Sequence, residues 1–344
     1  MKFKSVSASY FIIVILFFST SVQGQTPLTD KLFHADSIKS IVSFLASDKM
    51  KGRLTGSKEM EKSSNYIADE FRKAPVLPVM GNDGYFSRFT FEFIKGESIQ
   101  GINVIAAIPG RSKADEIVIF CSHYDHIGSL TNKQIAYGMG NKFDKKDKIY
   151  NGANDNASGT SAVILLARYF AEADINERTI LFITFAGEEF GLRGSSAFAN
   201  SINPEKVKAV VNIEMIGRGL YDDQHNPYIT GDSLSDFRDL LNDRLQNQLT
   251  DSSVKRIVFG NDLFVNDNLF TRSDNYPFAL VGIPAHTIML SMPSDPFYHS
   301  LDDEIDTLNF EDMSLIIKSI ALSTAGLVSG IDTPTRINPR KLLH

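Results

Sequence analysis

The chain has 344 residues, of which 43% are hydrophobic, and a formal net charge of −6. A chain of this length and apolar content can bury a sizeable core. Cys121 is its single cysteine, which excludes an intramolecular disulfide framework. The acidic balance, without a basic stripe interleaved with aromatic residues, argues against nucleic acid as a partner.

The N-terminal residues have the pattern of a secretory signal. Lys2 and Lys4 precede an apolar run over residues 10–18, and the small residue Gly24 follows, so residues 1–24 are predicted to be a signal peptide. The run is too short to span a bilayer comfortably, no later stretch is long enough to do so, and no cysteine lies near the cleavage point. We therefore expect no membrane anchor after cleavage, and a mature protein that is periplasmic or extracellular.

Segments with helical and strand-like spacing follow in chain order. Helical spacing of apolar residues comes first, over residues 35–46 and 62–73. From there, apolar runs typical of strands buried on both faces alternate with further helices. The expected strands are 102–108, 117–121, 179–186, 207–216 and 285–290, and the expected helices are 157–173, 192–201, 234–248 and 310–328. This alternation predicts an α/β fold, a three-layer α/β/α sandwich with a mostly parallel central sheet.

No internal repeat or linker interrupts this pattern, so one domain is predicted over residues 25–331. Residues 332–344 contain proline and the basic cluster 336–341, which is typical of a loose C-terminal tail. Two irregular stretches lie within the domain. Residues 129–151 are long and polar, which favours a functional loop, and residues 260–274 carry apolar side chains that could line a pocket or pin the loop to the core.

Polar side chains gather where the predicted strands end, which is where open α/β sheets bind ligands. Three strands run into the polar segments SHYDHIG, FAGEEFG and NIEMIG, and two further candidates precede helices. The candidates are His123 and Asp125, Glu188 and Glu189, Glu214, Asp155 in GANDNASG, and His299 in YHSLDDEIDTL.

Each candidate also has a purely structural explanation. Asp155 could be a helix N-cap worth about 1 kcal/mol, the paired glutamates could complement a helix macrodipole, and Asp125 could be a turn residue. Single histidines are more often structural than ligands. Glu214 is harder to explain, because an unpaired carboxylate in an apolar strand would cost several kcal/mol. Nearby Arg218 or the strand edge could still neutralise it.

Apart from Asp125, these residues supply two imidazoles and three carboxylates, with one further glutamate beside a ligand. Such mixed nitrogen and oxygen donors suit zinc. A single catalytic zinc needs only three protein ligands, whereas five with one shared carboxylate would hold two ions about 3.5–4 Å apart. Of the adjacent pair Glu188 and Glu189, one would then bind metal and the other could transfer protons.

These motifs resemble those of the co-catalytic dizinc aminopeptidase and carboxypeptidase family, which includes bacterial leucyl aminopeptidases and glutamate carboxypeptidases. The similarity runs from about Lys51 to Leu327 through MKGRLTGS, SHYDHIG, GANDNASG, FAGEEFGLRGS, NIEMIGR, RSDNYPFALVGIP and YHSLDDEIDTL. Each motif is modestly specific, but seven in order are strongly so. The resemblance implies an α/β/α sandwich and a zinc-dependent exopeptidase, an aminopeptidase first of all, with a peptide or aminoacyl substrate.

The resemblance also implies a ligand set for two zinc ions per chain. Asp155 would bridge the two ions. Glu189 and His299 would complete one site, and His123 and Glu214 would complete the other. Many relatives have aspartate where this chain has Glu214, a departure that could alter the affinity or metal preference of that second site.

The remaining roles follow from the same resemblance. Glu188 would be the general base for a metal-activated water. Asp125 would orient His123 through its other ring nitrogen. The peptide bond between Asp155 and Asn156 would be cis.

Other functions stay open. A glutaminyl cyclase resembles this fold but uses one zinc; Glu214 supplies a second-site ligand that cyclases lack, and Tyr298 stands where cyclases typically have tryptophan, which this chain does not contain. A non-catalytic, receptor-like relative would usually have lost a ligand or the base, and none is missing. The sequence does not decide between aminopeptidase, carboxypeptidase and dipeptidase action, and it leaves the preferred residue and the oligomeric state open.

Overall fold

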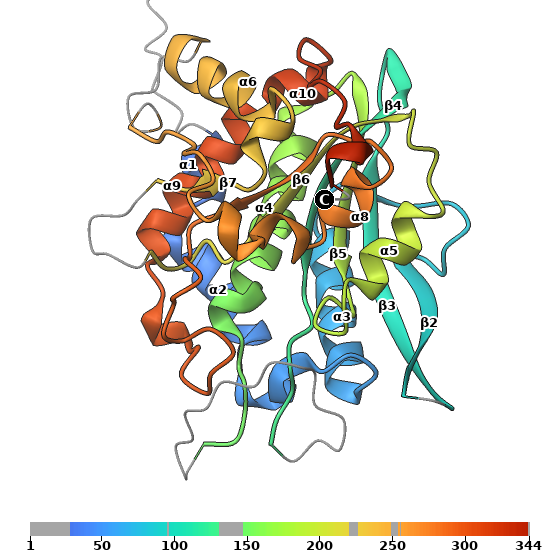
Figure 1. The fold of residues 1–344 in the computed structure, drawn as a ribbon, viewed down its shortest axis with the longest axis vertical. Coiled ribbons are helices and arrows are strands. Elements are labelled where there is room, and N and C mark those ends of the chain that lie inside the picture. The colour runs from blue at the N-terminus through green and yellow to red at the C-terminus, as the bar shows by residue number, and fades with distance from the viewer. Residues whose placement is uncertain are drawn as a thin grey trace, which may run out of the picture.

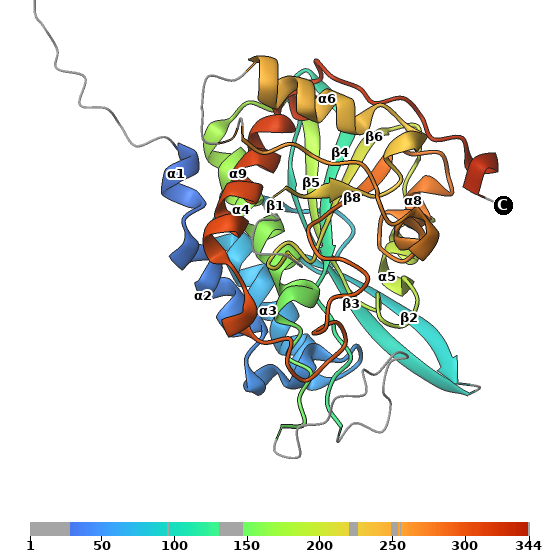
Figure 2. The same cartoon turned by 60° about the vertical axis from the view of Figure 1, so that its left-hand side comes forward.

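The computed structural model describes residues 28–94, 96–130, 147–219, 226–248, 254 and 256–342. The predicted signal peptide at residues 1–24 lies outside these residues. In the described part, a central sheet lies between two layers of helices (Figure 1, Figure 2). This arrangement confirms the predicted α/β/α sandwich.

The sheet is mixed, with a parallel centre. Its strands are β1 Leu77–Pro78, β2 Phe86–Ile94, β3 Glu97–Ile108, β4 Lys113–His123, β5 Arg178–Phe185, β6 Val207–Glu214, β7 Tyr228–Ile229 and β8 Ala285–Met289. Their order is β1-β3-β5-β4-β6-β8-β7, and β2 pairs with β3 outside this path. Strands β5, β4, β6 and β8 run parallel to one another, whereas β1, β2, β3 and β7 are joined antiparallel.

The structure contains every helix and strand that the sequence predicted, and it adds β1, β2, β7, α1 and α8. The helices are α1 Leu28–Leu32, α2 Ala35–Leu45, α3 Lys58–Arg72, α4 Gly159–Ala173, α5 Arg193–Ala199, α6 Phe237–Asp243, α8 Tyr276–Ala279, α9 Phe310–Ser323 and α10 Ala325–Ser329. The helix predicted over residues 310–328 is thus divided between α9 and α10.

Alternate residues of the central strands pack into two separate cores. Val118 and Phe120 of β4 point into the layer formed by α2, α3, α4 and α9, whereas Ile119 and Cys121 point into the layer formed by α5 and α8. Because both faces of these strands are buried, their sequences are continuously apolar instead of alternating.

The last long helical segment is also the most apolar. Residues Phe310–Ser329 are long and apolar enough to cross a membrane, and 61% of that apolar window is buried inside the protein. The prediction that no stretch after the N-terminal run reaches this length is therefore wrong. The composition has a local cause, because α9 packs against α2 and α4, and a helix surrounded by core has the apolar composition of a membrane span.

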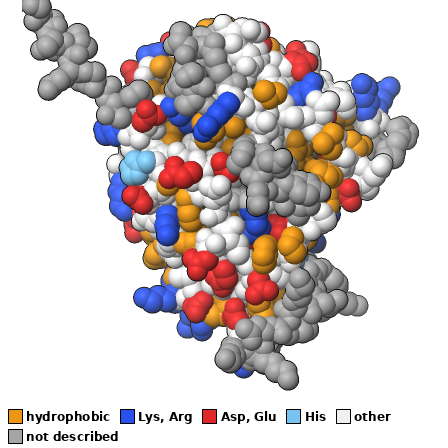
Figure 3. Space-filling view, turned by 90° about the vertical axis from the view of Figure 1, so that its left-hand side faces the viewer, with side chains coloured by type: hydrophobic (Ala, Val, Ile, Leu, Met, Phe, Trp, Pro, Cys, Tyr) orange, Lys and Arg blue, Asp and Glu red, His pale blue; other side chains and the backbone are white. Residues whose placement is uncertain are grey.

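Charged side chains of both signs are intermixed on the face of the molecule that carries α1 and α9. Figure 3 shows Lys and Arg scattered among Asp and Glu there, with the acidic groups crowded toward one end. Over the described residues of this face there is no continuous basic stripe of the kind that tracks a nucleic-acid backbone.

The predicted loose tail is wrong for residues 332–342, which pack against the domain. Arg178 donates a hydrogen bond to the carbonyl oxygen of Asp332 at 2.7 Å, and Arg336 donates to two carbonyl oxygens at 3.0 Å. Ile337 is only 2% exposed. The sequence pattern concealed this docking, because the apolar residues that pack against the domain, among them Ile337 and Leu342, are separated by basic and polar residues.

Buried His286 makes part of the stability of the fold depend on pH. Its Nδ1 donates to the carbonyl oxygen of Thr230 at 3.0 Å, Ser235 Oγ donates to Nε2 at 2.7 Å, and Phe237 stacks on the ring. Burial lowers the pKa of His286 from 6.5 to about 4. Between these values the unfolded chain binds a proton that the folded chain does not, so this stabilisation is complete above pH 6.5 and is lost as the pH falls toward 4.

We expect this histidine to lower the free energy of unfolding by about 2 kcal/mol between pH 7.5 and pH 5. His286→Gln cannot titrate and should lack that component. Urea unfolding of both proteins at the two pH values measures the difference, with exposed His34→Gln as the matched control. Equal pH dependence in the wild type and in His286→Gln would contradict the assignment.

Candidate metal centre

Three parallel strands end at one edge of the sheet and carry candidate residues there. Strand β4 ends at His123, β6 ends at Glu214, and β5 ends at Phe185, shortly before Glu188. In the register of the sheet, His123 lies beside Phe185. Because the carboxyl ends of parallel neighbours meet, side chains from distant parts of the chain converge at this edge.

His123, Asp155 and Glu214 form the first cluster of possible metal ligands, with donor atoms within 4.8 Å of one another. His123 Nε2 is buried, lies 3.2 Å from Asp155 Oδ1 and makes no hydrogen bond within the described residues. Glu214 accepts a hydrogen bond from Ser273. Since buried imidazole nitrogens are normally paired, this one, facing carboxylates, fits a metal ligand.

Asp155 also belongs to a second cluster, with His126, Glu189 and His299. His299 Nε2 lies 3.2 Å from Asp155 Oδ2 and 3.2 Å from Glu189 Oε2. The two carboxylate oxygens of Asp155 thus face different clusters, Oδ1 toward His123 and Oδ2 toward His299. All five donors that the sequence singled out as ligands are brought together around this one aspartate.

His126 is a member of the second cluster that the sequence reasoning missed. It is fully buried, and its Nδ1 lies 2.7 Å from Glu189 Oε1 and 3.8 Å from Asp155 Oδ2. The signal was present in SHYDHIG, where a second histidine directly follows Asp125, three positions after the strand end. The family resemblance supplies only five ligands, and so it gave His126 no role.

We expect His126→Asn to weaken zinc binding at the second cluster by about 10- to 100-fold, because a residue that binds the metal or fixes a ligand has at least this effect. Zinc retention during dialysis against a graded metal buffer measures the loss without relying on activity. Exposed His34→Asn is the matched control. Unchanged zinc retention in His126→Asn would mean that the imidazole only fills space.

Asp125 acts on its neighbours through two different groups. His123 Nδ1 donates to the backbone carbonyl oxygen of Asp125 at 3.2 Å, and the nearest carboxylate oxygen is further away at 3.8 Å. The carboxylate instead accepts from Thr55 Oγ1 at 2.7 Å and from the backbone N–H of Glu188 at 3.3 Å. The backbone of Asp125 thus sets the tautomer of His123, and its side chain fixes the start of the Glu188 loop.

Buried carboxylates dominate the electrostatics of the centre. Burial, followed by the charges of Asp155, Asp274 and Glu189, raises the pKa of Glu214 from 4.5 to about 8. Burial and the nearby glutamates also raise the pKa of Glu188 well above its usual range. So many buried carboxylates are costly unless a cation compensates them.

Arg218 does not neutralise Glu214. Arg218, the alternative partner that the sequence offered, pairs with Asp295 at 2.8 Å and with Asp303 at 3.3 Å. Burial alone would lower the pKa of His123, but the surrounding carboxylates, first Glu188, raise it well above 6.5. The local charge balance therefore favours a bound metal ion at this position.

Two buried ionic groups hold the loop that presents Asp155. Arg53, from the motif MKGRLTGS, donates to the carbonyl oxygen of Tyr124 at 2.7 Å and to that of Gly152 at 2.9 Å, which joins the loop after β4 to the loop before α4. The Asp303 carboxylate accepts from the backbone N–H of Asp155 at 3.0 Å. The Asp155-Asn156 peptide bond is cis, as the resemblance implied.

Two hollows meet at the centre. The inner pocket is the more enclosed one, and its walls beside the clusters are largely apolar, formed by Met215, Leu269, Met289, Met292 and Pro293. The outer cavity is open to solvent, and its own walls are formed by Phe93, Phe190, Leu192, Arg193 and Tyr276. Four residues border both hollows: Glu188, Arg272, Tyr298 and His299.

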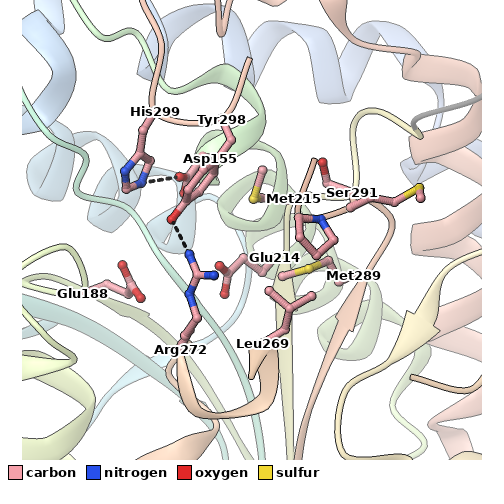
Figure 4. Close-up of a pocket in the computed structure, with 12 residues that line it drawn as sticks. Asp155, Glu188, Glu214, Met215, Leu269, Arg272, Met289, Ser291, Tyr298 and His299 are labelled. Carbon is pink, nitrogen blue, oxygen red and sulfur yellow. Dashed lines mark hydrogen bonds and ion pairs between the residues drawn. The ribbon is translucent and has the colours of Figure 1, made fainter. Parts of the chain in front are cut away.

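Figure 4 shows how these shared residues lie. Glu188 stands apart from both ligand clusters and points into the space in front of them, while His299 contacts Asp155. Tyr298 stacks on the His299 ring at 3.9 Å, and its hydroxyl accepts a hydrogen bond from Arg272 at 3.2 Å. A carboxylate that faces the centre without joining a cluster is suitably placed to exchange protons with a substrate.

Comparison with known proteins agrees with this geometry. The family model described as peptidase family M28 matches residues 103–323. Aminopeptidase YwaD of Bacillus subtilis is 27% identical over 170 residues, covering 46% of this chain and 34% of its own length. The probable leucine aminopeptidase 1 of Trichophyton verrucosum is 25% identical over 305 residues, covering 81% of this chain and 74% of its own length. The matched region is thus only about a third of YwaD.

Solved structures share the fold at lower identity. The LapA aminopeptidase of Legionella pneumophila superimposes with a TM-score of 0.64 at 20% identity, covering 88% of this chain and 74% of that one. A glutaminyl cyclase of Porphyromonas gingivalis superimposes with a TM-score of 0.62 at 16% identity, covering 86% and 99%. At these identities the likeness concerns the fold alone, and it is shared by a peptidase and a cyclase.

Proposed function

The chain belongs to peptidase family M28, and from this premise we propose that it is a zinc-dependent exopeptidase, specifically an aminopeptidase. The observation that carries the proposal is the pair of ligand clusters that share Asp155 beside an enclosed apolar pocket. A shared carboxylate between two sets of nitrogen and oxygen donors suits a pair of zinc ions.

We propose two zinc ions per chain. His123 and Glu214 would hold one, His126, Glu189 and His299 the other, and Asp155 would contribute to both. This assignment is supported by the buried Nε2 of His123, which has no hydrogen-bond partner among the described residues, and by the surplus of buried carboxylates. When bound, zinc would polarise the scissile carbonyl and lower the pKa of a water molecule toward about 7.

Glu188 is the proposed general base. It belongs to neither cluster but borders both hollows, so a peptide bond placed across the centre would lie next to its carboxylate. Glu188 takes a proton from the attacking water and then delivers it to the departing amine.

The inner pocket is the proposed site for the N-terminal residue of the substrate. Three methionines, Met215, Met289 and Met292, and Leu269 give it an adaptable apolar wall. We therefore expect a preference for an apolar N-terminal residue such as leucine or methionine. The rest of the peptide leaves through the open outer cavity, because the inner pocket is too enclosed to pass a chain.

Hydrolysis of leucine p-nitroanilide by the purified full chain tests this function. We expect cleavage that a chelator abolishes and that zinc restores, and no cleavage once the leucine amine is acetylated. Cleavage of N-blocked peptides from their C-terminus would instead establish a carboxypeptidase. Absence of any zinc-dependent hydrolysis would overturn the proposal.

Glutaminyl cyclisation is the second candidate function, because a solved cyclase shares the fold. Two features favour the peptidase: Glu214 completes a second cluster, and Tyr298 stacks on His299 where the resemblance leads one to expect tryptophan in a cyclase. Metal analysis separates the two functions. One zinc per chain, together with ammonia release from N-terminal glutaminyl peptides, would favour the cyclase.

We also propose that the enzyme acts outside the cytoplasm. The proposal rests on the signal-like residues 1–24, where two lysines precede an apolar run. Fractionation of cells that express the full chain, with and without these residues, tests it. Equal recovery of both forms in the cytoplasm would count against export.

A further inference from the structure

Two arginines line the outer cavity, and neither of them has a role in the proposed reaction. Arg193 opens helix α5, and Arg272 lies at the boundary with the inner pocket, beside Tyr298. Both side chains are exposed to solvent. The cavity therefore presents two permanent positive charges beside the metal centre.

Neither guanidinium is neutralised by a carboxylate of the described residues within ion-pair distance. Arg193 Nε donates to the carbonyl oxygen of Phe190 at 2.8 Å and lies over the ring of Phe91 at 5.6 Å. Arg272 donates to the Tyr298 hydroxyl at 3.2 Å and lies over that ring at 5.8 Å. Neutral acceptors and aromatic faces hold the two groups in place, and each keeps further N–H donors for a ligand.

The position of the two positive charges determines which part of a bound substrate lies next to them. In the proposed function the N-terminal residue fills the inner pocket, so the residue after the scissile bond lies in the outer cavity. Of the acidic groups of that cavity, Glu189 belongs to a ligand cluster and Glu188 is the proposed base beside it. Beyond them the open part of the cavity offers the arginines and the apolar rings of Phe93 and Phe190.

We propose that Arg193 and Arg272 form a carboxylate-binding subsite for the residue that follows the scissile bond. This inference rests on the proposed function and deepens it by naming the substrate class: peptides with an acidic second residue, or dipeptides, whose second residue carries the free terminal carboxylate. Guanidinium groups bind both kinds of carboxylate through paired, charge-assisted hydrogen bonds.

The test compares kcat/KM within two matched substrate pairs, using the zinc-loaded full chain. Leu-Glu-amide against Leu-Gln-amide isolates a side-chain carboxylate, and Leu-Ala against Leu-Ala-amide isolates the terminal one. We expect the wild type to favour the charged member of at least one pair by about tenfold, and this ratio should shrink as salt is added. The pair that discriminates identifies which carboxylate is bound.

Variants assign the preference to the two arginines. In the double variant Arg193→Met, Arg272→Met the ratio should fall to about one, whereas Arg340→Met, an exposed arginine on the C-terminal segment that lines neither hollow, should keep it. Because the ratio is taken within each variant, a loss of folded enzyme cancels.

The failures of the two proposals are distinguishable. Hydrolysis of all four peptides without preference in the wild type, or a preference that survives in the double variant, overturns the subsite and leaves the aminopeptidase intact. If none of the four peptides is cleaved, the proposed function itself fails, and the subsite fails with it.

Discussion

Glu188→Gln should lower kcat by about 10²–10⁴-fold while the two proposed zinc ions stay bound. The amide keeps the size and shape of the side chain but can neither accept the proton of the attacking water nor pass it to the leaving amine. Zinc should be retained, because Glu188 belongs to neither ligand cluster. Turnover of leucine p-nitroanilide and metal analysis of the same preparation provide the two readouts.

The neighbouring glutamate supplies the contrast for this experiment. Glu189 contacts His126 at 2.7 Å and His299 at 3.2 Å, so Glu189→Gln should lose zinc as well as activity. Exposed Glu61→Gln should change neither quantity. If Glu188→Gln loses activity only in proportion to lost zinc, Glu188 is a ligand and not the base, and if it keeps activity the assignment is wrong.

The sequence predicted the fold where burial leaves a strong local signal. Residues 117–121 and 179–186 form apolar runs because both faces of β4 and β5 are covered, and helical spacing located α2 and α4. The strands at the edge of the sheet were harder to predict from the sequence. Strand β2 was missed although Phe89, Phe91 and Phe93 alternate along it, a pattern that indicates a strand with one exposed face.

The first residue of a helix was also difficult to predict from the spacing of apolar residues. The helix predicted to begin at residue 62 begins at Lys58, because Ser57 caps it by accepting a hydrogen bond from the backbone N–H of Met60 at 3.0 Å. The spacing of apolar residues gives no indication of this N-cap, because the first turn of α3 is mostly charged. A polar N-cap residue is the signal that would have placed the start correctly.

At the metal centre, residue type and position after strands or before helices selected a set that the fold does bring together. They could not decide which members of one motif face the metal site. SHYDHIG offers two histidines and an aspartate within four positions, and only the course of the chain after β4 turns His126 toward Glu189. The same turn sends the Asp125 carboxylate to Thr55. The spacing of residues along the sequence alone carries no information about the directions in which their side chains point.

The shared position of Asp155 leads to the other large expected effect. Asp155→Asn should remove both proposed zinc ions, because each cluster uses a different oxygen of this carboxylate. Oδ1 lies beside His123 and Oδ2 lies beside His299. We expect the zinc affinity of both sites to fall by more than about 100-fold. Even the mutation of a residue that only hydrogen-bonds a metal ligand typically lowers metal affinity by about 10- to 100-fold. Activity should be lost with the metal.

Glu214→Gln is the decisive comparison, because Glu214 belongs to one cluster only. This variant should keep one zinc per chain, held by the cluster that contains Glu189. Asparagine at position 155 preserves the backbone N–H that donates to Asp303 at 3.0 Å, so circular dichroism should find the fold of Asp155→Asn intact. Retention of one zinc in Asp155→Asn would mean that the two sites do not depend on a common carboxylate, and the sharing that makes them a single catalytic unit would have to be abandoned.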